Sequence, residues 1–156
     1  MKRLVAVLLS VASLFYVSIS VAASSGPSGG TGGGAFYDAP LANEVVSHVR
    51  VRHGAWIDAI QLTYRNIVTN TYRNGGFRGG FGGGDSWAVL APNEYVTTVW
   101  GYYGSYVNAL NFRTNLGNTY YRGNASGVYY QYDVPGRLTG VKGRSGAYLD
   151  SVGVVW

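Results

Sequence analysis

Gly54-Ala55-Trp56-Ile57-Asp58 and Gly146-Ala147-Tyr148-Leu149-Asp150 are two copies of one pattern: a glycine, an aromatic residue two positions later, and a closing aspartate. Gly104-Ser105-Tyr106-Val107-Asn108 is a third copy in which asparagine replaces the aspartate. Because glycine makes up 24 of the 156 residues, a single G-x-x-x-D match has little weight. Repetition of the whole pattern indicates that the fold builds one small polar turn several times.

Further landmarks coincide when the chain is shifted by 50 residues. Asn43-Glu44 falls on Asn93-Glu94, and the glycine-rich run 29–34 falls on the run 79–84. A shorter third unit has residues 123–127 as its loop and ends with the last G-x-x-x-D copy. Periodicity on this scale is typical of one supersecondary unit used repeatedly.

The residues that follow each motif alternate between apolar and other side chains, which is the pattern of a strand with one buried face. The apolar positions are Ile60 and Leu62, Leu110 and Phe112, and Val152 and Val154. Before the first motif, Val45, Val49 and Val51 alternate with His48, Arg50 and Arg52, which predicts a hairpin that turns at the motif. Three sheets with one apolar face each bury those faces against one another. We therefore predict an all-β fold, a β-prism or barrel of three antiparallel sheets with pseudo-threefold symmetry.

Residues 1–22 have the pattern of a secretory signal peptide. A basic start, Met1-Lys2-Arg3, precedes an apolar run without charge, and small residues at Ala22 and Ala23 suit cleavage there. The run approaches the roughly 20 residues that span a bilayer, but the small-residue stretch 24–31 favours cleavage over a retained anchor. We expect a secreted protein with a flexible segment at 23–28, a single domain at 29–156, and no membrane insertion after signal removal.

Composition excludes several function classes. The chain has no cysteine, which removes thiol catalysis, disulfides and cysteine metal sites. The formal charge of +5 falls to +3 when Lys2 and Arg3 leave with the signal, a balance that does not favour nucleic acid. No histidine–carboxylate spacing matches a zinc site, and no Gly-Lys-Ser/Thr follows the glycine loops to bind phosphate. We expect no metal and no cofactor.

Two other functions are disfavoured by the same residues. The segment 77–83 resembles an RNA-binding RGG stretch, but it holds one arginine in one copy. Asp58 and Asp150 would act as a glycosidase pair only at a separation of roughly 5–10 Å, and pseudo-symmetry places them in different repeats. We expect no catalytic residues and no enzyme activity.

Taken together, four stretches resemble the jacalin-related lectins, and the resemblance covers the region 29–156. They are the glycine loop leading into Ala35-Phe36-Tyr37-Asp38, the segment 54–64, Asn111-Phe112-Arg113-Thr114-Asn115, and the segment 143–154. The resemblance implies a β-prism of three four-stranded antiparallel sheets. It also implies a sugar site built from loops at one end of the prism.

In that family, the C-terminal G-x-x-x-D loop meets the N-terminal glycine loop. Carried over to this chain, the resemblance implies a first carbohydrate site made of Gly33, Gly146, Ala147, Tyr148, Leu149 and Asp150. A second site of the same design would consist of Gly83, Gly54, Ala55, Trp56, Ile57 and Asp58. In each, the aspartate accepts from sugar hydroxyls and backbone N–H groups donate to sugar oxygens. By hypothesis, Trp56 and Tyr148 cover one face of the sugar, with Trp87 contributing as well.

The departures from the family pattern narrow this prediction. Asn108 and its loop, which is not a glycine run, predict a turn that binds no sugar. The galactose-preferring branch requires an amino-terminal glycine freed by proteolysis, whereas Gly33 lies inside an uninterrupted glycine stretch, so the mannose/glucose-preferring branch matches better. Two alternatives stay open: a galactose-preferring lectin, and a structural or adhesive prism in which the aspartates merely cap their turns. The expected partners are glycans on glycoproteins or cell surfaces, and homo-oligomerisation is left open.

Overall fold

The computed structural model describes residues 22–156, so residues 1–21 of the predicted signal peptide lie outside the described part of the chain. The described residues form 13 β-strands. No helix in this part of the chain is long and apolar enough to cross a membrane.

The strands make three sheets in which every neighbouring pair is antiparallel. The first sheet has the order β1 (Ser24–Gly29), β13 (Leu149–Val155), β12 (Gly140–Ser145) and β2 (Gly34–Asp38). The second sheet has the order β5 (Tyr72–Asn74), β4 (Ile57–Asn66), β3 (Glu44–His53) and β7 (Gly84–Val89), and β6 (Arg78–Gly79) also pairs with β4. The third sheet has the order β10 (Thr119–Tyr120), β9 (Val107–Thr114), β8 (Val96–Tyr103) and β11 (Val128–Asp133).

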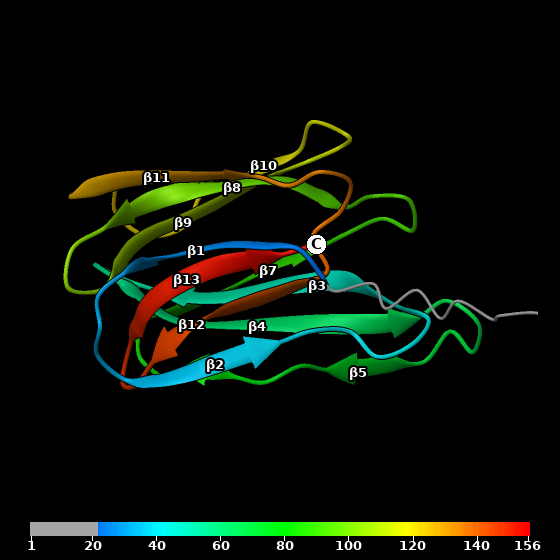
Figure 1. The fold of residues 1–156 in the computed structure, drawn as a ribbon, viewed down its shortest axis with the longest axis horizontal. Coiled ribbons are helices and arrows are strands. Elements are labelled where there is room, and N and C mark those ends of the chain that lie inside the picture. The colour runs from blue at the N-terminus through cyan, green and yellow to red at the C-terminus, as the bar shows by residue number, and fades with distance from the viewer. Residues whose placement is uncertain (1–21) are drawn as a thin grey trace, which may run out of the picture.

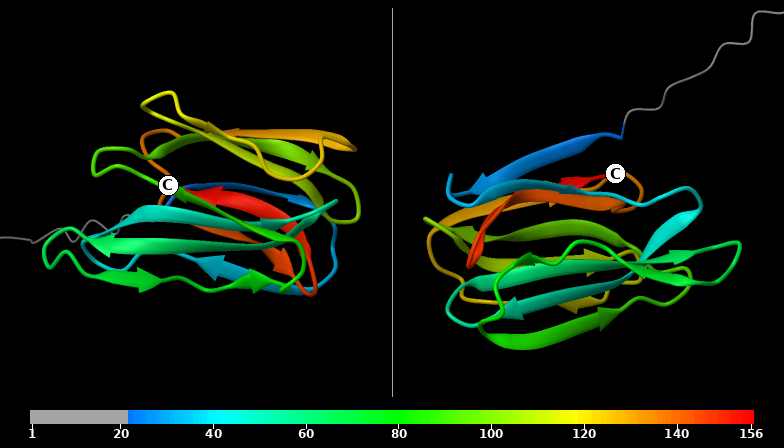
Figure 2. Two further views of the ribbon diagram at one scale, coloured as in Figure 1. Left: turned by 180° about the vertical axis from the view of Figure 1, so that it is seen from behind. Right: turned by 90° about the horizontal axis from the view of Figure 1, so that it is seen from below.

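The three sheets surround one core, which confirms the predicted β-prism with three antiparallel sheets (Figures 1 and 2). The second and third sheets each come from one continuous stretch of chain. The first sheet instead joins the two ends of the described chain, because β1 and β2 pair with β13 and β12. The first predicted sugar site therefore combines Gly33 and Asp150, which lie more than 100 positions apart in the sequence.

The segment 23–28, expected to be flexible, is instead part of the first sheet. Ser24 pairs with Val155 and Gly29 with Ser151 along β13. Every residue of β13 is buried, so this strand needs a partner on each edge to satisfy its backbone N–H and C=O groups. Backbone pairing depends little on side chains, and for this reason a serine- and glycine-rich segment can form a strand while its composition predicts a linker.

The apolar positions predicted to face the core are buried, although in β9 and β13 the residues between them are buried as well. Ile60, Leu62, Leu110, Phe112, Val152 and Val154 are each at most 3% exposed. In β3 the alternation slips, because a bulge between Val46 and His48 buries Val46 in place of Val45. A gap at the centre of the core has a volume of about 10 Å³, at or below the size that holds one water molecule. The interior is therefore packed, and any ligand must bind on the surface.

The repeated Asn-Glu pair has a structural role in both repeats. Glu94 lies after a tight turn in which its backbone N–H donates to the carbonyl of Ala91 and its carboxylate accepts from the Ala91 N–H. Glu44 and Leu41 make the same reciprocal pair of hydrogen bonds. The Glu94 carboxylate also accepts from Thr114 Oγ1 and Asn118 Nδ2, both at 2.7 Å. Glu94 thus joins the start of the third sheet to the turn that follows β9.

We predict that Glu94→Gln lowers the free energy of unfolding at pH 7 by about 1–3 kcal/mol, because the new amide N–H₂ meets donors where an acceptor is required. Burial alone would raise the pKa of Glu94, but the hydrogen bonds from Ala91, Asn118 and Thr114 outweigh it and leave the pKa lowered. Glu94 therefore adds stability above the ordinary pKa of glutamate, and this stability is lost as pH falls through the lowered value.

Urea unfolding of both proteins between pH 7 and pH 3 measures this effect. The difference between wild type and Glu94→Gln should shrink toward acid pH. Asp133→Asn, on an exposed carboxylate of β11, is the matched control and should change stability by less than about 0.5 kcal/mol. An equal loss in both variants would show that the Glu94 hydrogen bonds are not the cause.

Candidate functional site

All three G-x-x-x-D/N turns lie at one end of the prism. They join β3 to β4, β8 to β9 and β12 to β13, and the loop from β1 to β2 reaches the same end, on the left of Figure 1. Each turn is closed by the same hydrogen bond at 2.9 Å, from the motif glycine N–H to the carbonyl of the aromatic residue. The pairs are Gly54 with Trp56, Gly104 with Tyr106, and Gly146 with Tyr148. The motif's last residue is the second of the next strand, so a rigid strand holds its side chain.

The loop from β1 to β2 packs against Asp150 as the resemblance implied. The N–H of Gly30 donates to the Asp150 carbonyl at 2.8 Å. Gly33 has a φ of +61°, which favours glycine. A Cβ on Gly32 would meet one oxygen of the Asp150 carboxylate, and a Cβ on Gly33 would meet the other. Glycine at positions 32 and 33 is therefore what lets the loop backbone approach both carboxylate oxygens.

The same arrangement recurs at Asp58. The N–H of Gly80 donates to the Asp58 carbonyl at 2.9 Å, and Gly83 has a φ of +65°. Added Cβ atoms on Gly82 and Gly83 would again meet the two carboxylate oxygens. The structure thus brings together the predicted residues of each site, Gly33 with Gly146–Asp150 and Gly83 with Gly54–Asp58.

Both aspartates are buried but have no internal hydrogen-bond donor. Asp150 is 5% exposed and Asp58 is 6% exposed. Within residues 22–156, neither carboxylate accepts a hydrogen bond or joins an ion pair, and the N–H groups of Gly33, Ala147 and Tyr148 donate to no protein acceptor. A buried carboxylate without donors is unfavourable unless water or a ligand supplies them. Each site therefore offers paired acceptors and adjacent donors to a ligand.

The third copy of the motif is built differently. Asn108 Nδ2 donates to the carbonyl of Ser126 at 2.7 Å, and the Asn124 N–H donates to the Asn108 carbonyl at 2.8 Å. The Asn108 amide is thus turned toward its own loop and holds it closed. Its side chain shapes the turn, and its polar group is already satisfied by the protein.

Two arginines that the sequence analysis did not select hold the glycine loops in place. Arg144 donates from Nε to the Gly32 carbonyl at 2.8 Å and from Nη2 to the Gly33 carbonyl at 2.7 Å. Arg52 donates in the same way to the carbonyls of Gly82 and Gly83, at 2.8 and 2.9 Å. Both lie two residues before the motif glycine, where the third repeat has a tyrosine. This constant spacing is the signal that would have identified them.

The motif aromatics pack on one another. The ring centroid of Trp56 lies 5.3 Å from that of Tyr148 and 5.8 Å from that of Tyr106, and the two tyrosines lie 5.0 Å apart. One aromatic cluster therefore stands between the three turns, and Trp56 remains 42% exposed. Trp87, which was expected to contribute to a sugar site, lies instead beside Arg50 and His48 on the outer face of the second sheet.

Each site also contacts residues of a neighbouring repeat. A hollow of about 300 Å³ beside Asp150 is lined by Gly30, Thr31, Gly32, Ser105, Tyr106 and Asp150. Ser105 and Tyr106 belong to the third motif, so the turn that lacks a carboxylate forms one wall of the first site. In the same way, a Cβ on Gly80 in the second glycine loop would meet the carbonyl of Ala147 in the first site. Sequence comparison of the repeats could not show this, because it depends on their order around the prism.

The charges around the second site favour a neutral histidine. Burial lowers the pKa of His53, the nearby Arg122 cation lowers it further, and the Asp58 carboxylate opposes both. Its Nε2 lies 2.9 Å from Ser86 Oγ. Among the described residues, no group of three or more His, Cys, Asp or Glu side chains is arranged to hold a metal ion.

The model of the Jacalin-like lectin domain matches residues 25–155. The chain belongs to the jacalin-like lectin family. The jacalin-related lectins and mannose-binding structural neighbours to which it is similar are non-enzymatic carbohydrate-binding proteins.

Several relatives share this jacalin-like domain. Jacalin-related lectin 3 of Arabidopsis thaliana is 33% identical over 140 residues, which are 85% of this chain and 23% of that protein. The mannose/glucose-specific lectin of Parkia pendula is 29% identical over 84% of this chain and 31% of its own length. Horcolin of Hordeum vulgare is 33% identical over 82% of this chain and 92% of its own length. The chain thus spans less than a third of the first two relatives and nearly all of the third.

Solved structures of the family have the same architecture. The mannose-binding lectin of Champedak superimposes with a TM-score of 0.77 at 25% identity, covering 88% of this chain and 98% of that one. A mannose-binding jacalin-related lectin of Ananas comosus superimposes with a TM-score of 0.73 at 26% identity, covering 86% and 96%.

We predict that Arg144→Ala loosens the first glycine loop of this jacalin-like lectin without unfolding the prism, because two carbonyls lose their charged donors. The ¹⁵N relaxation order parameters at residues 32–34 should fall to below about 0.6, the range of a flexible backbone. Arg137→Ala, on an exposed arginine outside the loops, should leave these order parameters unchanged. Unaltered order parameters in Arg144→Ala would refute the positioning role.

Proposed function

We propose that this protein is a secreted lectin that binds mannose- or glucose-type glycans through two sites, one at Asp150 with Gly33 and one at Asp58 with Gly83. The observation that carries the proposal is the pair of buried carboxylates that face glycine loops without any protein donor. Family membership and the mannose-binding relatives support the same class of ligand.

The chemistry of the site suits a pyranose. Sugar hydroxyls both donate and accept, so two neighbouring hydroxyls can donate to one carboxylate while the backbone N–H groups donate to their oxygens. The exposed faces of the aromatic cluster offer an apolar surface to the C–H groups of a sugar ring. The negative charge of the carboxylate strengthens each hydrogen bond that it accepts.

The preference for mannose or glucose over galactose is supported by chain continuity at Gly33. In this chain the Gly33 nitrogen is an amide inside the glycine run, which can donate one hydrogen bond to a ligand and carries no charge. The galactose-preferring branch uses a free amino terminus at the corresponding place. The alternative of a structural prism without working sites is less well supported, because neither carboxylate accepts a hydrogen bond from the described residues, whereas the Asn108 amide is bonded within its own loop.

Each site alone should be weak. Four or five hydrogen bonds to hydroxyls give about 0.5–1.5 kcal/mol each, because water competes for the same groups. After ordering costs, this predicts a Kd in the high-micromolar to millimolar range, as a rough expectation. Two sites on one prism end raise the strength on a dense glycan surface by roughly 10²–10⁴ when both engage. Oligomerisation of the chain would add further sites.

We predict that Asp58→Ala with Asp150→Ala abolishes retention on a mannose matrix while the far-UV circular dichroism stays that of the wild type. Each substitution removes both acceptors of one site. Asn108→Ala is the matched control, because it changes the same motif position in the turn without a carboxylate, and it should stay bound and elute with methyl α-mannoside. Retention of the double variant with elution by mannoside would show that the sites lie elsewhere.

We further predict that either single aspartate variant keeps monosaccharide binding but loses most of its cross-linking. A protein with one working site per chain cannot bridge two glycans unless it oligomerises. Haemagglutination titre, measured at matched monomeric state in sedimentation runs, reports the loss. Full agglutination by monomeric Asp58→Ala would count against a second working site.

A further inference from the structure

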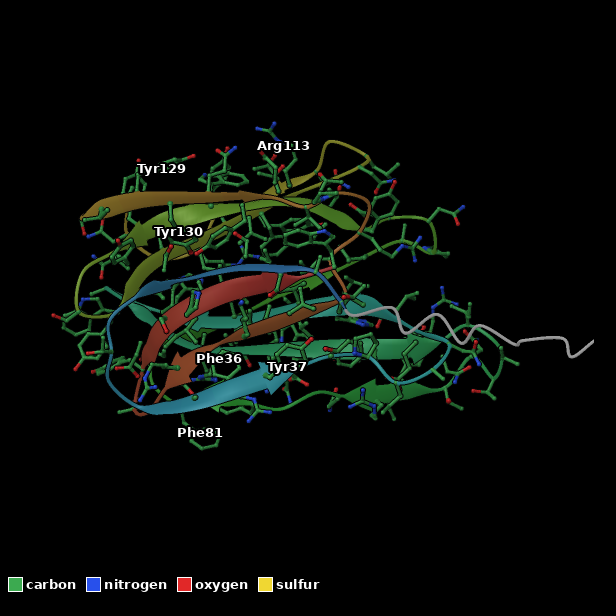
Figure 3. The ribbon with its side chains drawn as sticks, in the orientation of Figure 1. Phe36, Tyr37, Phe81, Arg113, Tyr129 and Tyr130 are labelled. Carbon is green, nitrogen blue, oxygen red and sulfur yellow. The ribbon has the colours of Figure 1, made fainter. Side chains whose placement is uncertain are left out.

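The outer face of the third sheet carries a hollow that includes none of the residues of the two carboxylate sites. Its volume is about 340 Å³, near the lower end of the range of about 300–1,000 Å³ that ligand pockets occupy. Residues of β8, β9 and β11 and the side chain of Tyr121 line it. Figure 3 shows Tyr129 and Arg113 pointing outward from this sheet, whereas Tyr130 points to the core.

Two opposite charges face this hollow without meeting. Thr98 on β8 pairs with Asp133 on β11 and with Arg113 on β9, so the three side chains form one row across the sheet. Asp133 and Arg113 are therefore two strand spacings apart, about 9–10 Å. The ion pairs among residues 22–156 join Arg50, Arg52 and Arg73 to other acids and involve neither of them. The short Thr98 side chain forms the floor of the hollow between the Asp133 carboxylate, an acceptor, and the Arg113 guanidinium, a donor.

Contacts along the face hold both polar groups in orientation. Tyr129 donates from its hydroxyl to Gln131 Oε1 at 2.6 Å, and Gln131 Nε2 donates to Asp133 at 3.1 Å. On the other side, the Arg113 guanidinium lies 5.8 Å from the ring centroid of Trp100. The edge of Trp100 is in turn packed against Tyr121, at 5.9 Å between centroids. A hollow bordered by oriented polar groups and aromatic rings is a preorganised surface.

The second sheet shows how the same position is closed elsewhere in the prism. His48 takes the register position of Thr98, and its ring fills the space between Tyr72 and Trp87. Arg50, an outward arginine of that sheet, is paired with Asp85 at 2.7 Å. The third sheet has neither the filling ring nor the ion pair, so its face remains open.

We propose that this hollow is a third carbohydrate site, of a different design, that binds a neutral oligosaccharide chain along the face of the sheet. A ligand with net charge is attracted by one of Arg113 and Asp133 and repelled by the other, whereas hydroxyls accept from the guanidinium and donate to the carboxylate. Trp100, Tyr121 and Tyr129 offer apolar ring surface to the C–H groups of the sugar. The site stands independently of the two carboxylate sites at the prism end.

The test uses ¹⁵N-labelled protein carrying Asp58→Ala and Asp150→Ala, so that the prism-end sites do not contribute. Cellohexaose, maltohexaose and mannohexaose are titrated separately, and amide shifts are followed together with the Trp100 indole N–H. At least one hexasaccharide should give saturable shifts at Thr98, Trp100 and Tyr129. Thr98→Phe, which fills the floor, should abolish them, and Arg113→Ala or Asp133→Ala should each weaken binding about tenfold or more.

Thr98→Phe placed in the otherwise wild-type chain should keep its retention on a mannose matrix, which shows that the fold and the prism-end sites are intact. Three titration results would overturn the proposal: the absence of shifts with all three sugars, equal shifts in the Thr98→Phe protein, and saturation of the same resonances by the zwitterion glycylglycine instead. Shifts that follow protein concentration, with dimers in sedimentation runs, would assign the face to contact between copies and would likewise overturn it. A failure here leaves the mannose-matrix result for the aspartate sites unaffected.

Discussion

Two largely buried aspartates whose carboxylates accept no hydrogen bond from the described residues are the feature on which the rest of this structure depends. Asp58 and Asp150 each have a glycine loop against both oxygens, and any side chain on those glycines would meet them. Partial burial of a carboxylate without a protein donor is unfavourable, so the fold must stabilise this arrangement through other contacts. The stabilising contacts are the packed core of three sheets and the hydrogen bonds that Arg52 and Arg144 donate to the loop carbonyls.

The prism makes this possible by giving every repeat the same hairpin at the same end. The motif turn fixes where each aspartate leaves its strand, and the preceding arginine fixes the loop that faces it. The third repeat keeps the turn but has neither the aspartate nor the arginine. Its Asn108 amide is satisfied by Ser126, and its Tyr106 forms a wall of the neighbouring hollow. One repeat therefore supports the site of another.

Much of this could be predicted from the sequence, because the repeated information is local. Alternating apolar residues such as Ile60 and Leu62 give strands, and the turns between them give hairpins. What could not be predicted depends on contacts between distant segments. The pairing of Ser24–Gly29 with β13 is a matter of backbone partners, and composition is silent on it. The contact among Trp56, Tyr106 and Tyr148 requires knowing the order of the turns around the axis.

The arginines are an intermediate case. Arg52 and Arg144 have a constant spacing to the motif glycine, yet on an alternating strand they look like ordinary solvent-facing residues. Only the loop that folds over each strand end gives them their acceptors. The open face of the third sheet is similar, since the difference between Thr98 and His48 at one register position has meaning only when the neighbouring strands are known.

The most direct measurement of the central claim is a titration of the ¹⁵N-labelled wild-type protein with methyl α-mannoside, followed residue by residue. Two groups of amides should shift and saturate, one at residues 32–34 and 146–150 and the other at 54–58 and 82–84, while residues 123–127 stay unchanged. Equal shifts at the Asn108 loop, or no shift near Asp58 and Asp150, would contradict the account.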